Sequence, residues 1–418
     1  MLYFIYTIIY IIALIFFLPF EYMKREKNNR LSWLRERTGK PLEPENTVNK
    51  PCLWVHAVSV GEVVSAVAFI QRINSAFPDI RLIVSTVTDT GRKVAKERLG
   101  HIARIVYIPF DIPFCIRNAI SSYKPSLFLI METELWPNII REFKCRGVPV
   151  LIINGRISEK SFNGYKKAKF FIKDVLQIID KFCMQNELYA KRIIQIGAPS
   201  EKIFIAGNFK FDARPPNSVP DWTKLLHGRV IVAGSTHHPE EEIILNTYIK
   251  LKEKFSSITM ILAPRHPERF AEVEELVSKK GLRYIKRSDL PTQFLSKIEN
   301  KVVILDVIGE LASVYGVCDI AIIGGSFIKH GGQNPLEPAY WSKGIVCGPS
   351  MENFPFIEEF YRENAALFTT PENLFDCLFK LLETPDEITS MGRRAREIYD
   401  KNSGAIERTF GVVKNYLN

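Results

Sequence analysis

Polar and small residues directly follow several apolar runs of strand length, and chemistry would depend on these side chains. In HAVSVGEV, Ser59, Gly61 and Glu62 come after the run at 52–58 and open a stretch with helical spacing. A glycine at such a turn lets a ligand approach the backbone, and the turn is similar to a phosphate-binding loop. The structural alternative for Glu62 is an ordinary first-turn glutamate that complements the helix dipole.

A pair of carboxylates follows the run SLFLIME (126–132). In METELWPN, Glu132 and Glu134 precede a tryptophan and Pro137, a residue suited to a first helical turn. Two carboxylates at one strand end could hold a substrate hydroxyl or shift each other's pKa. For Glu134 alone, capping of the next helix is the better interpretation.

Basic residues follow a strand candidate in the second half of the chain, in APRHPERF. Arg265 and Arg269 stand beside the start of a predicted helix, where anions are often bound. A surface turn without a ligand is the alternative. The segment DVIGEL (306–311) contains another strand-to-helix turn with Gly309 and Glu310, which by itself indicates little.

The densest group of unusual residues is IIGGSFIKHGGQNPLEPAYW (322–341). Four glycines surround a strand exit, and Asn334 and Glu337 open the next helix. Glu337 could accept hydrogen bonds from ribose hydroxyls, so the pattern suggests a nucleotide, although it is neither a Walker loop nor a G-x-G-x-x-G element. The structural alternative for Glu337 is the second half of a helix capping box.

Strands and helices must position these groups. From Cys52 onward, short apolar runs of strand length alternate with amphipathic stretches of helix length. The predicted fold class is α/β: two doubly wound parallel-sheet domains that face a cleft, preceded by one membrane helix. Open sheets of this kind bind ligands at the carboxyl ends of their strands, where the polar groups lie. The predicted strands are 52–58, 81–87, 103–109, 126–132, 148–154, 181–185, 229–235, 258–264, 301–306, 318–326 and 344–348.

A proline-rich stretch without hydrophobic periodicity, GNFKFDARPPNSVPDW, ends at Trp222 and marks the boundary between the two domains. Packing of the last helix back onto the first domain is an alternative for the C-terminal segment. The predicted segments are an anchor at 1–23, a basic juxtamembrane segment at 24–50, an N-terminal α/β domain at 51–210, a linker at 211–226 and a C-terminal α/β domain at 227–418.

The N-terminal segment predicts one membrane-spanning helix. Leu2 to Phe20 is almost entirely apolar and uncharged, and at about 1.5 Å per residue it could cross a hydrocarbon core of ~30 Å. The basic stretch at 24–40 follows it, and the positive-inside rule places that side in the cytoplasm. A cleaved signal peptide is the alternative, but it would need basic residues before the run and a small-x-small cleavage site after it.

The composition indicates which kinds of partner and which cellular compartment to expect. The net charge of +10 favours anionic partners. Nucleic acid is not predicted, because basic residues form no long run outside the juxtamembrane segment. Seven cysteines without a Cys-x-x-Cys pair indicate neither a disulfide framework nor a zinc site, and they favour a reducing compartment.

Taken together, six segments resemble the Kdo transferases, a family of GT-B glycosyltransferases that use the acidic sugar 3-deoxy-D-manno-octulosonic acid (Kdo). The resemblance runs from the anchor to near the C-terminus. The segments, in order, are WVHAVSVGE, METELWPN, GNFKFD, LAPRHPERF, GELASVYG and GGSFIKHGGQNPLEPA.

The resemblance implies an inverting, metal-independent transfer of Kdo from CMP-Kdo to the tetra-acyl lipid A precursor, lipid IVA, in lipopolysaccharide biosynthesis. No cofactor is implied. The resemblance also implies that the domain at 51–210 binds the acceptor and that the domain at 227–418 binds the CMP-sugar. It further implies a single-pass protein of the bacterial inner membrane, with its catalytic domains at the anionic lipid surface on the cytoplasmic side.

Family roles can be carried onto the matching residues. The glutamate of the S-x-G-E element is the general base in the family and corresponds to Glu62, while Glu132 and Lys210 correspond to residues that support the transition state. This chain has His238 where members often have a glutamate, which leaves the role of that loop open. The implied CMP contacts are Pro264, Arg265, Ile308, Gly309, Glu310, Asn334, Pro335, Leu336 and Glu337.

Two rival functions are compatible with the pattern. One is another envelope GT-B enzyme that uses a UDP-sugar, which inhibition by UDP instead of CMP would reveal. The other is a membrane-tethered nucleotide-binding or scaffold protein without chemistry, against which the presence of Glu62 and Lys210 argues.

Overall fold

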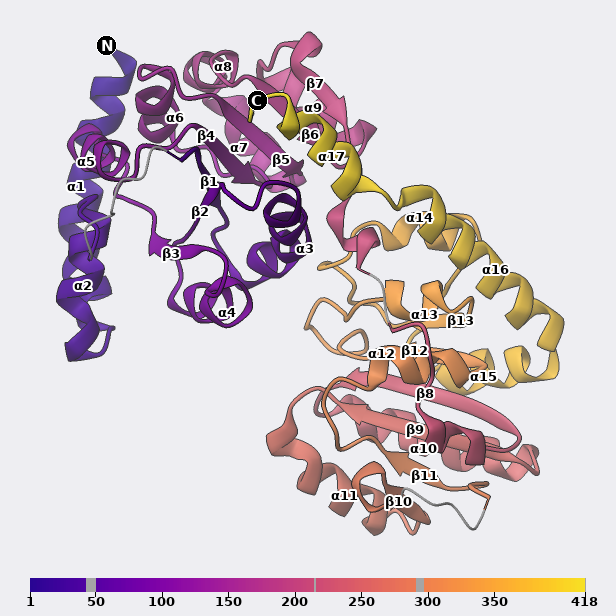
Figure 1. Cartoon of the computed structure of the whole chain (residues 1–418). Coiled ribbons are helices and arrows are strands. Elements are labelled where there is room, and N and C mark those ends of the chain that lie inside the picture. Colours follow the sequence, from indigo (N-terminus) through magenta and orange to yellow (C-terminus); the bar gives the residue numbers. More distant parts are fainter. Residues whose placement is uncertain (43–49, 214–215, 291–296, 418) are drawn as a thin grey trace. The chain divides into compact units, whose positions relative to one another are not determined.

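The computed structural model describes residues 1–42, 50–213, 216–290 and 297–417 (Figure 1). These residues divide into two compact units, the first formed by Met1–Ala213 with Ser403–Asn418 and the second by Arg214–Asn402. Residues 43–49 of the predicted juxtamembrane segment and residues 214–215 of the predicted linker lie outside the described residues.

In the described part of the first unit, seven parallel strands form one sheet in the order β3-β2-β1-β4-β5-β6-β7. The strands are β1 (Cys52–His56), β2 (Arg81–Thr86), β3 (Arg104–Tyr107), β4 (Leu127–Met131), β5 (Val150–Gly155), β6 (Lys181–Met184) and β7 (Ile203–Ile205). The helices are α1 (Leu2–Met23), α2 (Lys27–Arg37), α3 (Val60–Ala76), α4 (Asp89–Leu99), α5 (Pro113–Tyr123), α6 (Pro137–Lys144), α7 (Glu159–Lys167), α8 (Lys169–Gln177), α9 (Glu187–Ile196) and α17 (Ala405–Lys414). The strand order reverses between β1 and β4, which makes the ends of these two strands the topological switch point.

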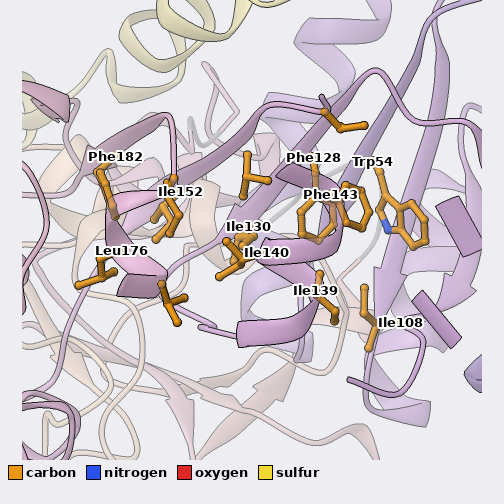
Figure 2. Packing of buried hydrophobic residues seen from close by; sticks show 14 of the residues in the cluster. Trp54, Ile108, Phe128, Ile130, Ile139, Ile140, Phe143, Ile152, Leu176 and Phe182 are labelled. Atoms are coloured by element: carbon orange, nitrogen blue, oxygen red, sulfur yellow. The ribbon is translucent and has the colours of Figure 1, made fainter. Parts of the chain in front are cut away.

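Both faces of this sheet are buried because its strands are apolar on both sides. Figure 2 shows one face, where Trp54 and Phe128 meet Phe143 of α6. The ring centroids of Phe128 and Phe143 are 4.2 Å apart, and those of Trp54 and Phe143 are 5.6 Å apart. The opposite face carries the alternate residues, such as Leu53 and Val55, and packs against α3 and α17.

The C-terminal segment belongs to the first unit. Phe410 of α17 is buried in the same apolar cluster as Phe69 of α3, and Arg72 lies over the ring of Phe410 at 3.9 Å. Asp212 accepts hydrogen bonds from the backbone N–H groups of Gly404 and, at 2.6 Å, Ile406, and so caps α17.

In the described part of the second unit, seven strands form a parallel sheet in the order β10-β11-β9-β8-β12-β13-β14. Its switch point lies between β8 and β12. The strands are β8 (Arg229–Thr236), β9 (Ile258–Pro264), β10 (Tyr284–Lys286), β11 (Val302–Ile304), β12 (Ile320–Ile323), β13 (Gly344–Cys347) and β14 (Leu367–Phe368). The helices are α10 (Glu240–Lys254), α11 (Phe270–Lys279), α12 (Leu311–Val314), α13 (Leu336–Tyr340), α14 (Ile357–Arg362), α15 (Leu374–Glu383) and α16 (Pro385–Asn402).

The N-terminal helix α1 is long and apolar enough to cross a membrane, with a mean hydropathy of 2.4 over its most apolar window. The basic stretch that follows it is only partly exposed. Arg37 is buried and donates to the carbonyl oxygen of Ile108 at 2.7 Å, and Arg25 stacks on the ring of Trp33 at 4.0 Å. These two arginines therefore pack within the first unit instead of facing solvent.

Candidate active site

Glu62 lies in the first turn of α3, directly after β1, and its side chain folds back onto the loop between them. Oε2 accepts a hydrogen bond from the backbone N–H of Val58 at 2.9 Å, and Oε1 accepts from the hydroxyl of Ser59 at 3.1 Å. Ser59 in turn caps α3 by accepting from the N–H of Glu62. Only 8% of Glu62 is exposed, so it is both a capping residue and a buried carboxyl group.

Burial raises the pKa of Glu62 to about 7, and the neighbouring carboxylates of Glu132 and Glu134 act in the same direction. The hydrogen bonds from Val58 and Ser59 oppose this rise. A carboxyl group with a pKa near neutrality can accept a proton at working pH and still release it, as a general base must.

Glu132 stands at the end of β4, on the other side of the switch point, with a left-handed backbone (φ +56°). Burial raises its pKa, while the positive charges of Arg156 and Lys210 oppose the rise. The Nε atom of Arg156 is 3.5 Å from Oε2 of Glu132. Burial and the charge of Glu132 also raise the pKa of Glu134.

Lys210 is held by loops that leave β5 and β7. It lies in a 3₁₀ turn (Phe209–Asp212) whose first N–H, that of Phe209, donates to Oδ1 of Asn154 at 3.1 Å. Asn208 accepts from the backbone N–H of Lys210 at 3.0 Å. Burial lowers the pKa of Lys210, and the charge of Glu132 counteracts this effect.

The structure therefore brings Glu62, Glu132 and Lys210 into one electrostatic cluster at the switch point of the first sheet, together with Glu134. Sequence reasoning missed two members, Asn154 and Arg156. Asn154 is the last residue of the predicted strand VPVLIIN and Arg156 lies two residues beyond it, so their place at a strand end was the available signal.

In the second unit, the buried carboxylate of Glu240 joins the two loops at the switch point. Oε1 accepts from the N–H of His237, in the β8 loop, at 2.8 Å and from the N–H of Gly325, in the β12 loop, at 2.5 Å. Oε2 accepts from the N–H of Phe327 at 3.3 Å. Burial raises the pKa of Glu240 to about 7. This bracing defines a role for the STHHPEEE loop, where His238 itself points to solvent and lies 3.4 Å from Glu272.

Arg265 and Glu337 interact at the same edge of the second sheet. The N–H of Arg265, which follows Pro264 at the end of β9, donates to the carbonyl oxygen of Thr236 at 2.9 Å. Burial raises the pKa of Glu337 to about 7, while Asn334 and the charge of Arg265 oppose the rise. Asn334 also accepts from the N–H of Leu336, next to Pro335, at 3.1 Å.

Three imidazole rings, those of His237, His266 and His330, lie together at the loop after β8. Sequence reasoning missed this group because the three histidines are far apart in the chain. The ring centroid of His237 is 4.0 Å from that of His330 and 5.4 Å from that of His266. Nε2 of His237 also lies 3.0 Å from Nε2 of Gln333. Burial and these basic neighbours lower the pKa of His237 to about 4, so it is neutral at pH 7.

The remaining segment predicted to bind the donor, residues 308–310, follows β11. Since β11 pairs in parallel with β9, this segment leaves the sheet at the same edge as Arg265. Ile308 is 82% exposed and Gly309 has a left-handed backbone (φ +95°). The carboxylate of Glu310 accepts from Arg287 at 2.8 and 2.9 Å and from the indole N–H of Trp222 at 2.9 Å. Glu310 therefore already has partners within the second unit.

A cavity of about 590 Å³ adjoins the first cluster. Its lining includes Glu134, the aromatic residues Trp136, Tyr165 and Phe171, and Tyr6 of α1. Among the described residues, no group of three or more His, Cys, Asp and Glu side chains has the arrangement needed to hold a metal ion.

Comparison with known proteins decides the family. The model of the 3-deoxy-D-manno-octulosonic-acid transferase (Kdo transferase) family matches residues 32–213. The chain is 34% identical over 374 residues to the 3-deoxy-D-manno-octulosonic acid transferase of Haemophilus influenzae, covering 87% of each chain. It is 32% identical over 385 residues to the corresponding Rickettsia felis enzyme, covering 89% of this chain and 81% of the relative. The chain belongs to the Kdo transferase family.

Kdo transferases are glycosyltransferases of lipopolysaccharide biosynthesis, and this membership confirms the family and the enzyme class predicted from the sequence. Solved structures confirm the fold class. A glycosyltransferase from Rickettsia africae covers 89% of this Kdo transferase and 100% of its own chain, with a TM-score of 0.56 and 16% identity. Staphylococcus aureus MnaA with UDP covers 88% and 97%, with a TM-score of 0.54 and 14% identity.

Proposed function

We propose that the enzyme transfers Kdo from CMP-Kdo to the lipid A precursor lipid IVA in an inverting single displacement, with Glu62 as the general base. The observation that carries this proposal is the buried carboxyl group of Glu62, with a pKa of about 7, at the switch point of the first sheet. Family membership supplies the sugar class, and the chemistry of the cluster supports the mechanism.

The reaction requires one proton acceptor. The acceptor hydroxyl attacks the anomeric carbon of Kdo, the bond from that carbon to the CMP phosphate oxygen breaks, and the hydroxyl proton passes to Glu62. CMP leaves with the bonding electrons. The cations of Lys210 and Arg156, beside Glu132, can stabilise negative charge that develops during the displacement.

We assign the donor to the second unit. Arg265 supplies a cation for the phosphate, and Glu337 and Asn334 supply acceptors for the ribose hydroxyls. The glycine-rich loop that Glu240 holds in place lies at the same switch point. The backbone of the segment at 308–310 completes the proposed set of contacts, together with Pro264, Pro335 and Leu336.

The acceptor and its location form part of the proposal. The cavity beside Glu134 is lined by aromatic side chains and by Tyr6 of the apolar helix α1, which suits an amphiphilic acceptor with acyl chains. We propose that α1 holds the enzyme at the anionic cytoplasmic surface of the bacterial inner membrane, where such an acceptor is found.

The test of the base is Glu62→Gln. An amide can still accept the N–H of Val58, so the loop is retained, but it cannot take the hydroxyl proton. We expect kcat to fall by about 10²- to 10⁴-fold, with binding of CMP-Kdo unchanged in calorimetry. The matched control is Glu187→Gln, an exposed first-turn glutamate of α9, which should keep full activity. A wild-type rate for Glu62→Gln, measured by mass analysis of the glycolipid product, contradicts the assignment.

We further propose that transfer needs no metal ion, because CMP leaves as a monophosphate that protein cations can stabilise. Activity should therefore be the same before and after exhaustive treatment with EDTA. A loss of activity in EDTA that added Mg²⁺ restores is the contrary result.

A further inference from the structure

The N-terminal helix α1 contacts the first unit near its N-terminus. The ring of Tyr3 meets that of Phe171 of α8 edge-on at 5.2 Å, and the guanidinium of Arg141 of α6 lies 4.8 Å from the centre of the Tyr3 ring. One turn later, Thr7 Oγ1 accepts a hydrogen bond from Nδ2 of Asn138 at 2.9 Å. This end of α1 is therefore bound to α6 and α8.

The N-terminal half of α1 is also bound through a buried acid. The hydroxyl of Tyr6 donates to Oδ2 of Asp111 at 2.7 Å, and Asp111 has no exposed surface. The ring of Tyr10 meets that of Trp136 edge-on at 6.4 Å. Without Tyr6, the carboxylate would lose its phenol donor and keep only backbone donors from Asn138 and Ile139.

The C-terminal half of α1 continues the same contact. Leu14, Leu18 and Tyr22 pack on the apolar cluster formed by Trp33, Phe110 and Cys115. The bound positions recur every three or four residues from Tyr3 to Tyr22, so one face of the helix rests on the first unit over its whole length (Figure 1).

The opposite face of α1 is exposed and apolar. The polar residues between Leu2 and Phe20, all of which the structure describes, are Tyr3, Tyr6, Thr7 and Tyr10, and each lies on the bound face. The large exposed side chains of α1 are Phe4, Ile5, Ile8, Ile9, Ile11, Ile12, Ile15, Phe16, Phe17, Phe20 and Met23.

A bilayer-crossing arrangement conflicts with these contacts. If α1 crossed while bound, the side chains of the first unit that pack along it would come to lie at the depth of the hydrocarbon, among them the carboxyl group of Asp111, and a charge is costly there. If α1 detached in order to cross, its hydroxyl groups would enter lipid and Asp111 would lose its phenol partner.

We propose that α1 lies along one leaflet of the membrane, with its exposed apolar face among the acyl chains and its other face bound to the first unit. Both ends of the helix then remain on the same side of the membrane as the unit. Interfacial helices have an apolar face and a polar face, and here the protein takes the place of the water that normally covers the polar face. This arrangement replaces the single crossing that length and composition alone suggest, and it does not depend on the reaction.

The first test is the sidedness of the N-terminus. A Gly-Ser-Cys spacer is inserted after Met1 in a Cys145→Ser background, since Cys145 is an exposed thiol. Lys160→Cys, on the exposed surface of α7, marks the side of the first unit in a second protein. We expect a membrane-impermeant maleimide to label both thiols from the same side of intact vesicles. Labelling from opposite sides overturns the proposal.

The second test fixes α1 to α6. Thr7→Cys and Asn138→Cys place thiols at two side chains that are in hydrogen-bond contact, and a short bis-thiol reagent joins them. The joined protein should sediment with vesicles of phosphatidylethanolamine and phosphatidylglycerol as fully as the unjoined protein does. Release from the vesicles after joining, or failure of the membrane-bound protein to join, overturns the proposal. The two single-cysteine variants treated with the same reagent are the controls.

Discussion

Glu62 has two roles that its position in the sequence cannot separate. Its place three residues after Ser59 predicts helix capping, and the structure shows these bonds. Its raised pKa also depends on the charges of Glu132 and Glu134, which lie in the loop that follows β4. Only the sheet order brings the ends of β1 and β4 together, so the raised pKa was beyond prediction from the local sequence.

Glu134 offers a test of this electrostatic coupling that leaves the proposed base in place. Its negative charge favours the protonated form of Glu62 and so raises the pKa of Glu62. Activity requires the ionised base, so kcat should rise with pH through that pKa of about 7. Glu134→Gln removes the charge, and we expect the rising limb of the pH profile to move to lower pH.

The measurement is kcat against pH from 5 to 9 for both proteins. Glu159→Gln, a first-turn glutamate of α7 on the exposed surface, is the control and should leave the limb unchanged. A limb that stays in place or moves to higher pH in Glu134→Gln would show that the two carboxyl groups are not coupled.

At the scale of elements, apolar periodicity predicted the long central strands, whereas the shortest edge strands were missed. β7 and β10 have three residues and β14 has two, and none of these residues is fully buried, whereas the equally short β11, which was predicted, is buried throughout. The switch points also required the sheet order. The hydrogen bonds between distant segments, from the N–H of Phe209 to Asn154 and from the N–H of Gly325 to Glu240, have no local sequence signature.

Glu240 tests the connection between the two loops of the second unit. It accepts three backbone N–H groups, whereas the amide of Glu240→Gln would direct its own N–H group toward one of these donors. A buried donor left without an acceptor costs about 1–3 kcal/mol. We expect the free energy of unfolding, measured in urea, to fall by this amount and the KM for CMP-Kdo to rise.

The matched control is Glu242→Gln, two residues along α10, whose carboxylate lies on the exposed surface and pairs with Lys280 at 3.0 Å. A surface pair of this kind contributes about 0–1 kcal/mol. Equal effects of the two substitutions would contradict the bracing role of Glu240.

At the scale of the whole molecule, the alternation of apolar runs with amphipathic stretches predicted the α/β class, and the uncharged apolar run predicted the N-terminal helix. It did not predict that α1 would be part of the packed structure, because the partners of α1 are distributed over α2, α6, α8 and the loop after β3. The hydropathy of α1 depends only on its own residues, whereas the contacts of Tyr6 and Thr7 depend on residues more than 100 positions away.

Deletion of residues 1–22 should therefore have a consequence beyond the loss of membrane binding that we propose. It uncovers apolar surface on Phe171, Trp136 and Phe110, and burial of one large apolar side chain is worth about 1.5–3 kcal/mol. We expect the shortened protein to melt at a lower temperature and to transfer less sugar to acceptor in vesicles, while it still binds CMP-Kdo. An unchanged melting temperature by calorimetry would contradict the packed state of α1.

The return of α17 to the first unit affects the order in which a ribosome can complete this protein. The ribosome synthesises α3 early, but α17, whose Phe410 covers one face of α3, emerges only after Arg214–Asn402 has been synthesised. At roughly 5–20 residues per second, the apolar surface of the nascent first unit that α17 covers stays exposed for on the order of ten seconds or more. During that interval we expect the uncovered apolar surface to make the unfinished chain prone to contact with a chaperone or with a neighbouring nascent chain.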